Sequence, residues 1–319
     1  MEIIVIAFMY LSFRLFWIFL ESGADDSRKY LPIPSRVGHY HVGAPLFSSG
    51  EFYEGYDHEN QRDILIKFLP VDLVYRSLNY IEKNKSLCDF KLIDQGFFRG
   101  GAFLIFETFE GISLKETLDK LRYSGNIFSM DLTLKIFLEI GENIKKISSQ
   151  GLMTGGFSPE NIFCNKHDKW SVDYWSTIGS TKLEGPEMAY AAIRYQAPEI
   201  VRGSKTFDPR SDVYTLGAIL YEMLVLVPWN ITSSGLGVLE KNSIAPSEVR
   251  TNLVKKLDEV VLKALEFEKE DRFDSVESFL KAVEEFCDFH CRGWKEIETG
   301  NFLEEIDVSC EAEKADKAA

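Results

Sequence analysis

The stretch from Gly151 to Phe163 constrains the fold of this 319-residue chain more than any other. It follows residues 130–149, where Ile136, Ile140 and Ile144 recur at helical spacing and predict a strongly amphipathic helix. The stretch itself reads Gly-Leu-Met-Thr-Gly-Gly-Phe-Ser-Pro-Glu-Asn-Ile-Phe, and Glu160 is its only acidic residue. A helix with one apolar face therefore delivers the chain to a loop rich in glycine.

This loop resembles the catalytic loop of protein kinases in the frame set by Pro159, Asn161 and Ile162. Further along, Ala197-Pro-Glu resembles the Ala-Pro-Glu signature of the family, and residues 208–223 resemble its buried central helix. The resemblance covers residues 40–286 and is closest to bacterial-type Ser/Thr kinases. It implies an α+β fold of two lobes, with a small antiparallel β-sheet lobe carrying one helix and a large, mainly α-helical lobe.

The resemblance also implies ATP and Mg²⁺ as ligands. In the family, a lysine of the third strand holds the α- and β-phosphates, an asparagine and an aspartate hold Mg²⁺, and the hinge faces the adenine. Asn161 and Asp173 would be the Mg²⁺ ligands, and Phe106 would be the gatekeeper next to the hinge. The residues expected at the nucleotide are Gly50, Lys67, Glu107, Glu110, Asn161 and Asp173.

Several positions depart from the family pattern around this site. Gly156 stands where the family has its catalytic aspartate. In the glycine-rich loop, Tyr53 replaces a glycine and would crowd the phosphates, and Gly55 replaces an apolar residue that covers the adenine. In the helix expected at residues 71–86, Ser77 falls where a glutamate normally pairs with the lysine. The altered loop and helix leave ATP binding open.

The loss of the acid–base group decides the predicted function. A positioned acid–base group contributes about 10²–10⁴ in rate, and Gly156 has no side chain to supply it. We therefore expect a pseudokinase, a kinase-like scaffold or regulatory module that acts on other proteins, such as an active kinase or its substrates. One alternative is an active Ser/Thr kinase that transfers the γ-phosphate of ATP to protein hydroxyls with Glu160 as base. The other is a different transfer reaction on the same fold, such as nucleotidyl transfer.

An apolar run at residues 3–20 is just long enough to span a bilayer as a helix. Arg14 near its middle costs about 2.5–3.5 kcal/mol, which the apolar neighbours offset. Arg28, Lys29 and Arg36 all follow the run, so the positive-inside rule places the following domain in the cytoplasm. The alternatives are an amphipathic surface helix and a misassigned start codon, and the second would leave a cytoplasmic protein.

These observations give a domain plan. It consists of a hydrophobic segment at 1–22, a linker at 23–39, a small lobe at 40–110, a large lobe at 111–290 and an acidic tail at 291–319. The net charge of −14 argues against a general nucleic-acid binder, because phosphate contacts need a surplus of Lys and Arg.

Smaller elements are predicted within this plan. Strands are expected at 40–46, 52–57 and 63–69. Ser113 and Glu116 predict a capping box at the start of a helix in the large lobe. The family resemblance implies an ion pair between Arg272 and Glu199.

Overall fold

The computed structural model describes residues 33–46, 52–70, 91–99, 101–108, 111–149, 157–173, 194–202, 204, 208–229, 231–232, 235–236 and 244–297. By its internal contacts the chain divides into two compact units, Met1–Ser35 and Arg36–Ala319. All the helices and strands given below lie in the second unit.

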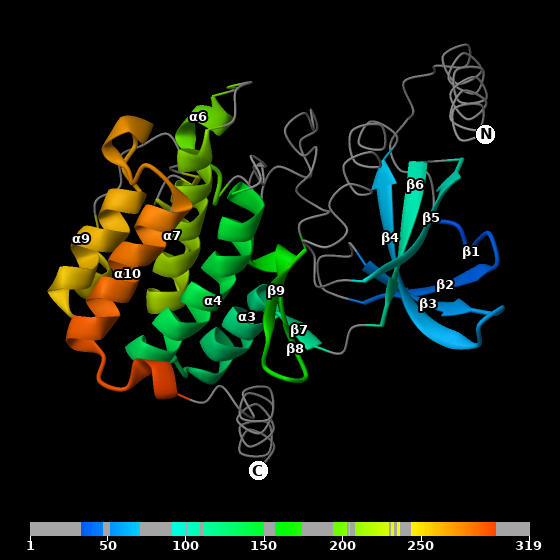
Figure 1. Ribbon diagram of the computed structural model, residues 1–319, viewed down its shortest axis with the longest axis horizontal. Helices are drawn as coiled ribbons and strands as arrows, with labels where there is room; N and C mark the ends of the chain where they lie inside the picture. The colour runs from blue at the N-terminus through cyan, green and yellow to red at the C-terminus, as the bar shows by residue number, and fades with distance from the viewer. Residues whose placement is uncertain are drawn as a thin grey trace. The chain divides into compact units, whose positions relative to one another are not determined.

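A six-stranded antiparallel sheet begins the second unit, with the strand order β1-β2-β3-β4-β6-β5 (Figure 1). Its strands are β1 (Arg36–Val37), β2 (Tyr40–Pro45), β3 (Phe52–Asp57), β4 (Arg62–Pro70), β5 (Leu92–Phe98) and β6 (Gly101–Glu107). The strands predicted at 40–46, 52–57 and 63–69 are confirmed. The first strand lies within the stretch that the sequence marked as linker.

The two faces of this sheet belong to different apolar clusters. One face contributes Phe52, Leu65, Leu104 and Phe106 to the large core that also contains the helices. The other face forms a separate cluster of buried residues, Val37, Tyr40, Val42, Ile64, Ile66, Phe103 and Ile105. Successive side chains of a strand point to opposite faces, so a residue's register decides which cluster it joins.

The rest of the unit is mainly helical, and two small sheets have the strand orders β7-β8-β9 and β10-β11. The strands are β7 (Gly111–Ser113), β8 (Ile162–Asn165), β9 (Trp170–Val172), β10 (Ile231–Thr232) and β11 (Gly235–Leu236). The α-helices are α3 (Leu114–Ser124), α4 (Met130–Ser148), α6 (Pro198–Val201), α7 (Pro209–Val225), α8 (Pro246–Val249), α9 (Lys255–Ala264) and α10 (Val276–His290). Short 3₁₀ turns are η2 (Pro159–Asn161), η5 (Lys269–Asp271) and η6 (Trp294–Glu296).

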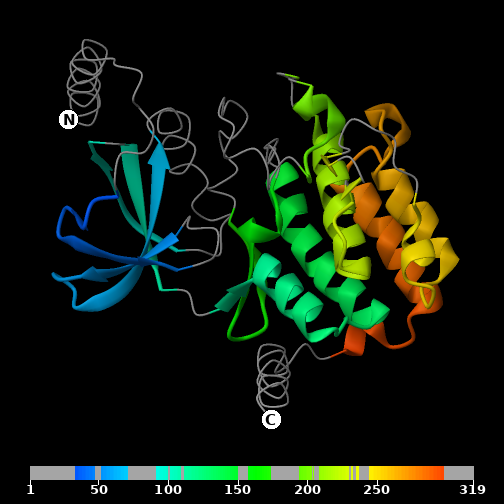
Figure 2. The same cartoon turned by 180° about the vertical axis from the view of Figure 1, so that it is seen from behind.

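The helices pack around α7, which is buried at every residue from Ser211 to Val225. A helix that is apolar on all sides must lie inside its domain. Helices α4, α7, α9 and α10 lie side by side in both views (Figures 1 and 2). The predicted amphipathic helix is α4, whose buried face includes Ile136, Ile140 and Ile144. The close approach of α4 to α10 depends on Gly141, because a Cβ there would lie 2.3 Å from Cδ2 of Leu280.

The predicted capping box is confirmed at the start of α3. The Ser113 hydroxyl accepts a hydrogen bond from the Glu116 N–H at 3.1 Å, and the Glu116 carboxylate accepts one from the Ser113 N–H at 3.1 Å. Two donors that the first helical turn leaves without a partner are satisfied in this way.

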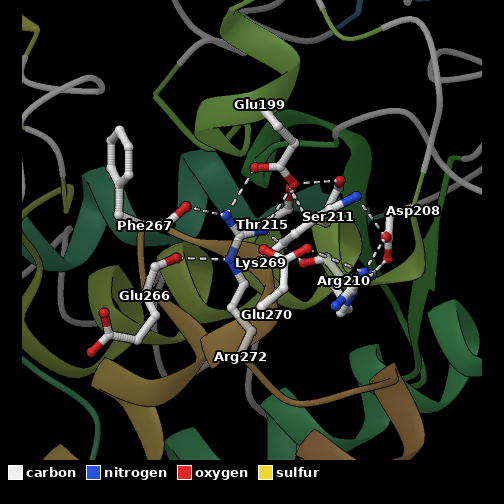
Figure 3. Close-up of polar contacts among 10 residues, drawn as sticks. All are labelled: Glu199, Asp208, Arg210, Ser211, Thr215, Glu266, Phe267, Lys269, Glu270 and Arg272. Atoms are coloured by element: carbon white, nitrogen blue, oxygen red, sulfur yellow. Dashed lines mark hydrogen bonds and ion pairs between the residues drawn. The ribbon is translucent and has the colours of Figure 1, made fainter.

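The predicted ion pair between Arg272 and Glu199 is confirmed, and it ties the segment after α9 to α6 and α7 (Figure 3). Two nitrogens of Arg272 donate to the two carboxylate oxygens of Glu199 at 2.9 Å each. The guanidinium also donates to the backbone carbonyls of Glu266, Phe267 and Arg210, at 2.7, 2.9 and 3.0 Å. All five donors of the guanidinium therefore have acceptors.

The α+β fold class is confirmed, with an antiparallel sheet followed by a mainly helical part. Within the described ranges, no helix is both long and apolar enough to cross a membrane. The apolar run at residues 3–20 lies outside these ranges.

Candidate nucleotide site

Lys67 lies in β4 on the sheet face that joins the larger apolar core. Its register partners are Phe52 on β3 and Leu104 on β6, which both belong to that core. The side chain is almost fully buried, with 3% of the residue exposed. A buried ammonium group is stable only when it is paired, so the neighbours of Lys67 decide what it can do.

Asp173 lies directly after β9, and three hydrogen bonds fix the backbone around it. The Asp173 N–H donates to the Asn161 carbonyl at 2.6 Å, which joins the two ends of the β8–β9 hairpin. Helix α4 holds the start of β9, because the Glu139 carboxylate accepts from the Trp170 N–H and the Asn143 amide donates to the Trp170 carbonyl, at 3.1 Å each. Asp173 is completely buried.

Lys67 and Asp173 form a direct ion pair. Nζ of Lys67 donates to Oδ2 of Asp173 at 2.7 Å, and the two side chains are 4% and 0% exposed. The residues are 106 positions apart in the chain, so only the folded structure brings them together. Two of the residues predicted at the nucleotide are therefore in contact, and each neutralises the charge of the other.

The ring of Phe52 lies against this ion pair. Nζ of Lys67 is 4.4 Å from the ring centroid, within the range of a cation–π interaction. The same ring makes edge contacts with Phe106 at 6.0 Å and with Phe163 of β8 at 5.9 Å between centroids. Phe52 has no exposed surface. It thus fills the space between the sheet, the amine of Lys67 and the β8–β9 hairpin.

Asn161 ends the turn η2 and is nearly buried. Its side-chain oxygen accepts from the N–H of Ser158 at 3.0 Å and from the hydroxyl of Ser158 at 3.2 Å. The oxygen that would face a metal ion is therefore bound to the loop's own backbone. Asn161 is close to Asp173 through the backbone hydrogen bond described above.

The predicted hinge begins at the end of β6. Phe106, the predicted gatekeeper, is fully buried beside Phe52. Glu107 is exposed, its carboxylate pairs with Lys91, and its N–H donates to the Lys91 carbonyl at 3.0 Å. Thr108 donates its hydroxyl to the Asp63 carbonyl at 2.7 Å. The side chain of Glu107 therefore points away from the Lys67 side of the sheet.

The register of β3 corrects two predictions about the glycine-rich loop. Tyr53 and Gly55 pair with Ile66 and Ile64, which lie on the sheet face opposite Lys67. Tyr53 packs on Phe68 in the second cluster, with 5.4 Å between ring centroids, so its side chain does not crowd the phosphate side of Lys67. A Cβ on Gly55 would lie 2.6 Å from Ile66, so that residue does not face an adenine either.

Other predicted positions lie outside the residues that the structure describes. They are Gly50, Glu110, Gly156 and the expected helix at 71–86 with Ser77. Of the residues predicted at the nucleotide, Lys67, Glu107, Asn161 and Asp173 are described, and the structure brings Lys67, Asn161 and Asp173 together.

Sequence reasoning missed the position of Phe52 on the face of Lys67. It also missed the contact between Ser158 and Asn161. The signal for Phe52 was present, because β3 and β4 are joined by a tight turn at residues 58–61. Counting outward from the pair of residues 57 and 62, one residue at a time on each strand, pairs residue 52 with residue 67. No comparable signal marks the second contact.

A thiol also lies in the β8 strand of the site. Cys164 is buried, and burial raises the pKa of its thiol to about 12, with the nearby carboxylates of Asp168 and Glu139 adding to the effect. The thiol is therefore protonated at neutral pH and is not a nucleophile, because only the thiolate reacts.

The side chains in this arrangement do not fit ATP with Mg²⁺. A nucleotide complex needs the lysine free for phosphate oxygens and the aspartate free for the metal. Here Lys67 and Asp173 bind each other, and the ring of Phe52 lies on the amine. No step of a phosphoryl transfer can be derived from these positions.

Comparison with known proteins relates the chain to protein kinases. Residues 91–282 match the family model described as Protein kinase domain. Tyrosine-protein kinase MasK of Myxococcus xanthus is 37% identical over 153 residues, which cover 46% of this chain and 24% of MasK. Serine/threonine-protein kinase PknB of Mycolicibacterium smegmatis is 24% identical over 260 residues, which cover 74% of this chain and 41% of PknB. The chain thus spans less than half the length of these curated relatives.

Solved structures show the same fold. The kinase domain of Mycobacterium tuberculosis PknI superposes with a TM-score of 0.59 at 20% identity. The match covers 81% of this chain and 100% of that one.

Proposed function

This chain belongs to the protein kinase family and is related to bacterial Ser/Thr kinases, and we propose that it is a pseudokinase. It uses the kinase fold as a scaffold or regulatory module for other proteins, such as an active kinase or its substrates. The single observation that carries this proposal is the buried ion pair between Lys67 and Asp173. The two charged groups that the family uses for phosphate and Mg²⁺ satisfy each other.

Two further observations support the proposal. The sequence places Gly156 at the position of the catalytic aspartate, which removes the group that accepts the proton of the substrate hydroxyl. The helical scaffold is retained, since Arg272 satisfies all five of its donors within it. A domain used for its shape needs the scaffold and has no need of the transfer residues.

The test is a phosphate-transfer assay with the full chain. The protein is incubated with γ-labelled ATP, Mg²⁺ or Mn²⁺, and a mixture of protein substrates with free Ser, Thr and Tyr hydroxyls. An active protein kinase is the positive control, and Asp173→Asn, which keeps the size of the side chain, is the matched variant. We expect the parent and Asp173→Asn to give the same background incorporation. Incorporation by the parent that Asp173→Asn abolishes would overturn the proposal.

An active Ser/Thr kinase is the second candidate, and the name of the relative PknB, a serine/threonine-protein kinase, favours it. Its base would be Glu160, the acidic residue of η2, which lies next to Asn161. If the parent does transfer phosphate, Glu160→Gln should reduce the rate about 10²–10⁴-fold, as expected for loss of a positioned base. An unchanged rate in Glu160→Gln would exclude this residue from the role.

We also propose that residues 3–20 anchor the domain to a membrane, with the domain in the cytoplasm. The length of the apolar run and the basic residues after it support this location. The full chain should remain in the membrane fraction after alkaline carbonate extraction. Release into the supernatant would indicate a surface helix or a cytoplasmic protein.

A further inference from the structure

We propose that Phe52 closes the nucleotide site from within, so that an adenine nucleotide enters only after this side chain moves. The inference rests on the proposed function and concerns the same site. It explains why the side chains do not fit ATP with Mg²⁺, and it identifies the residue that keeps the nucleotide out.

Phe52 lies on the face of the sheet where the family resemblance places the nucleotide. It is the first residue of β3 and stands opposite Lys67 in the sheet register, so both side chains leave the sheet on the same face. Phe106, the gatekeeper, lies on that face through its pairing with Leu65. A base that stacked under the sheet beside the gatekeeper would need the space that the Phe52 ring occupies.

Contacts on three sides hold the ring in this space. Phe106 lies on the neighbouring part of the sheet, Phe163 belongs to β8, and the ammonium of Lys67 faces the ring. Both aromatic pairs are edge-to-face, with interplanar angles of 63° and 89°. This is a favoured geometry for aromatic rings, and it spans the sheet and the β8–β9 hairpin.

The ring and the ion pair support each other. The amine of Lys67 is 2.7 Å from Asp173 and 4.4 Å from the Phe52 centroid. Moving the ring outward would expose one side of a buried charge pair to solvent, and breaking the pair would remove the cation from the ring. The Phe52 ring and the Lys67–Asp173 ion pair therefore stabilise each other, and displacing either one weakens the other.

The predicted ligand of the opened site is an adenine nucleotide with Mg²⁺. A smaller side chain at position 52 would vacate space beside Phe106 and leave Lys67 facing it. Valine suits this position because β-branched residues are favoured in strands. If ATP binds only the molecules in which the Phe52 ring has moved aside, its apparent affinity falls in proportion to the fraction of such open molecules.

The experiment measures the Kd of ATP for the full chain by isothermal titration calorimetry, with and without Mg²⁺. We expect Phe52→Val to bind ATP with Mg²⁺ at least about tenfold more tightly than the parent, which corresponds to a parent that is open in at most a tenth of its molecules. The matched control is Tyr53→Val, an aromatic-to-valine change in the same strand whose side chain packs on the opposite face. It should leave the Kd unchanged.

Phe52→Leu is the second variant and keeps most of the apolar volume, in case Phe52→Val fails to fold. It should also bind more tightly than the parent, by a smaller factor. Equal affinity in parent and variants, or an equal gain in Tyr53→Val, would overturn the inference. So would the absence of binding in folded Phe52→Val at millimolar ATP. A parent that binds ATP as tightly as folded Phe52→Val, without transferring phosphate, overturns only this inference, whereas a parent that transfers phosphate overturns the proposed function.

Discussion

Replacement of Arg272 by methionine should destabilise the protein strongly, and the contacts of Arg272 set the size of the effect. Its side chain has no exposed surface, and its five donors bind the Glu199 carboxylate and three backbone carbonyls (Figure 3). Methionine keeps part of the apolar stem and removes every donor. Among the described residues, the Ser211 hydroxyl would then be the side-chain group that still donates to the Glu199 carboxylate, at 2.7 Å.

Removing one partner of a buried ion pair costs about 3–5 kcal/mol, and the low end applies here because the remaining Glu199 carboxylate is 19% exposed. Three backbone carbonyls, of Arg210, Glu266 and Phe267, also lose a donor, which adds to the cost unless water replaces it. We therefore expect Arg272→Met to lower the free energy of unfolding by at least about 3 kcal/mol. This is a large share of the stability of a typical domain, about 5–15 kcal/mol.

The assay is urea denaturation of the full chain at neutral pH, followed by tryptophan fluorescence. Arg210→Met is the matched control, since Arg210 belongs to the same group of side chains and its partner Asp208 is as exposed as Glu199, at 19%, but the Arg210 side chain is 25% exposed and that of Arg272 is not exposed. An ion pair of that kind contributes about 0–1 kcal/mol. If Arg272→Met costs no more than Arg210→Met, burial of the Arg272 pair does not set its contribution, and the reasoning is wrong.

Three further predictions concern packing, pH and capping. Gly141→Ala should cost about 1–3 kcal/mol of stability, because the new methyl group meets Leu280. In the double variant with Leu280→Ala, the loss measured by urea denaturation should be smaller than the sum of the losses of the two single variants. Burial acts to raise the pKa of the Glu199 carboxyl, but hydrogen bonds from its arginine and serine partners outweigh it and hold the pKa below the ordinary value. The carboxyl therefore stabilises the fold above the unfolded-state pKa of about 4.3, and this contribution is lost as the pH falls toward the folded-state pKa. Between neutral pH and about pH 3.5, the urea midpoint of Glu199→Gln should fall by less than that of the parent. Ser113→Ala should lower the free energy of unfolding by about 1 kcal/mol through loss of the cap, and an unchanged melting temperature would contradict this.

Several elements could be predicted from local sequence patterns without any tertiary information. The spacing of Ile136, Ile140 and Ile144 was enough to predict α4, because one face of a helix repeats every three to four residues. Ser113 and Glu116 predicted a capping box, since both partners lie within one turn. The family resemblance added the pair of Arg272 with Glu199, which spacing alone could not supply.

The surroundings of Lys67 depend on contacts between distant segments of the chain. Its partner Asp173 is 106 residues away and comes close only when the β8–β9 hairpin packs against the sheet. The side of the sheet that a strand residue faces changes with every single step of register. The sequence predicts Tyr53 and Gly55 on the nucleotide side, whereas the register of β3 places both on the opposite face. Local patterns and the family resemblance were sufficient to predict α4, the cap of α3 and the residue types of the site. The structure decided which of these residues meet, because that depends on contacts between segments far apart in the chain.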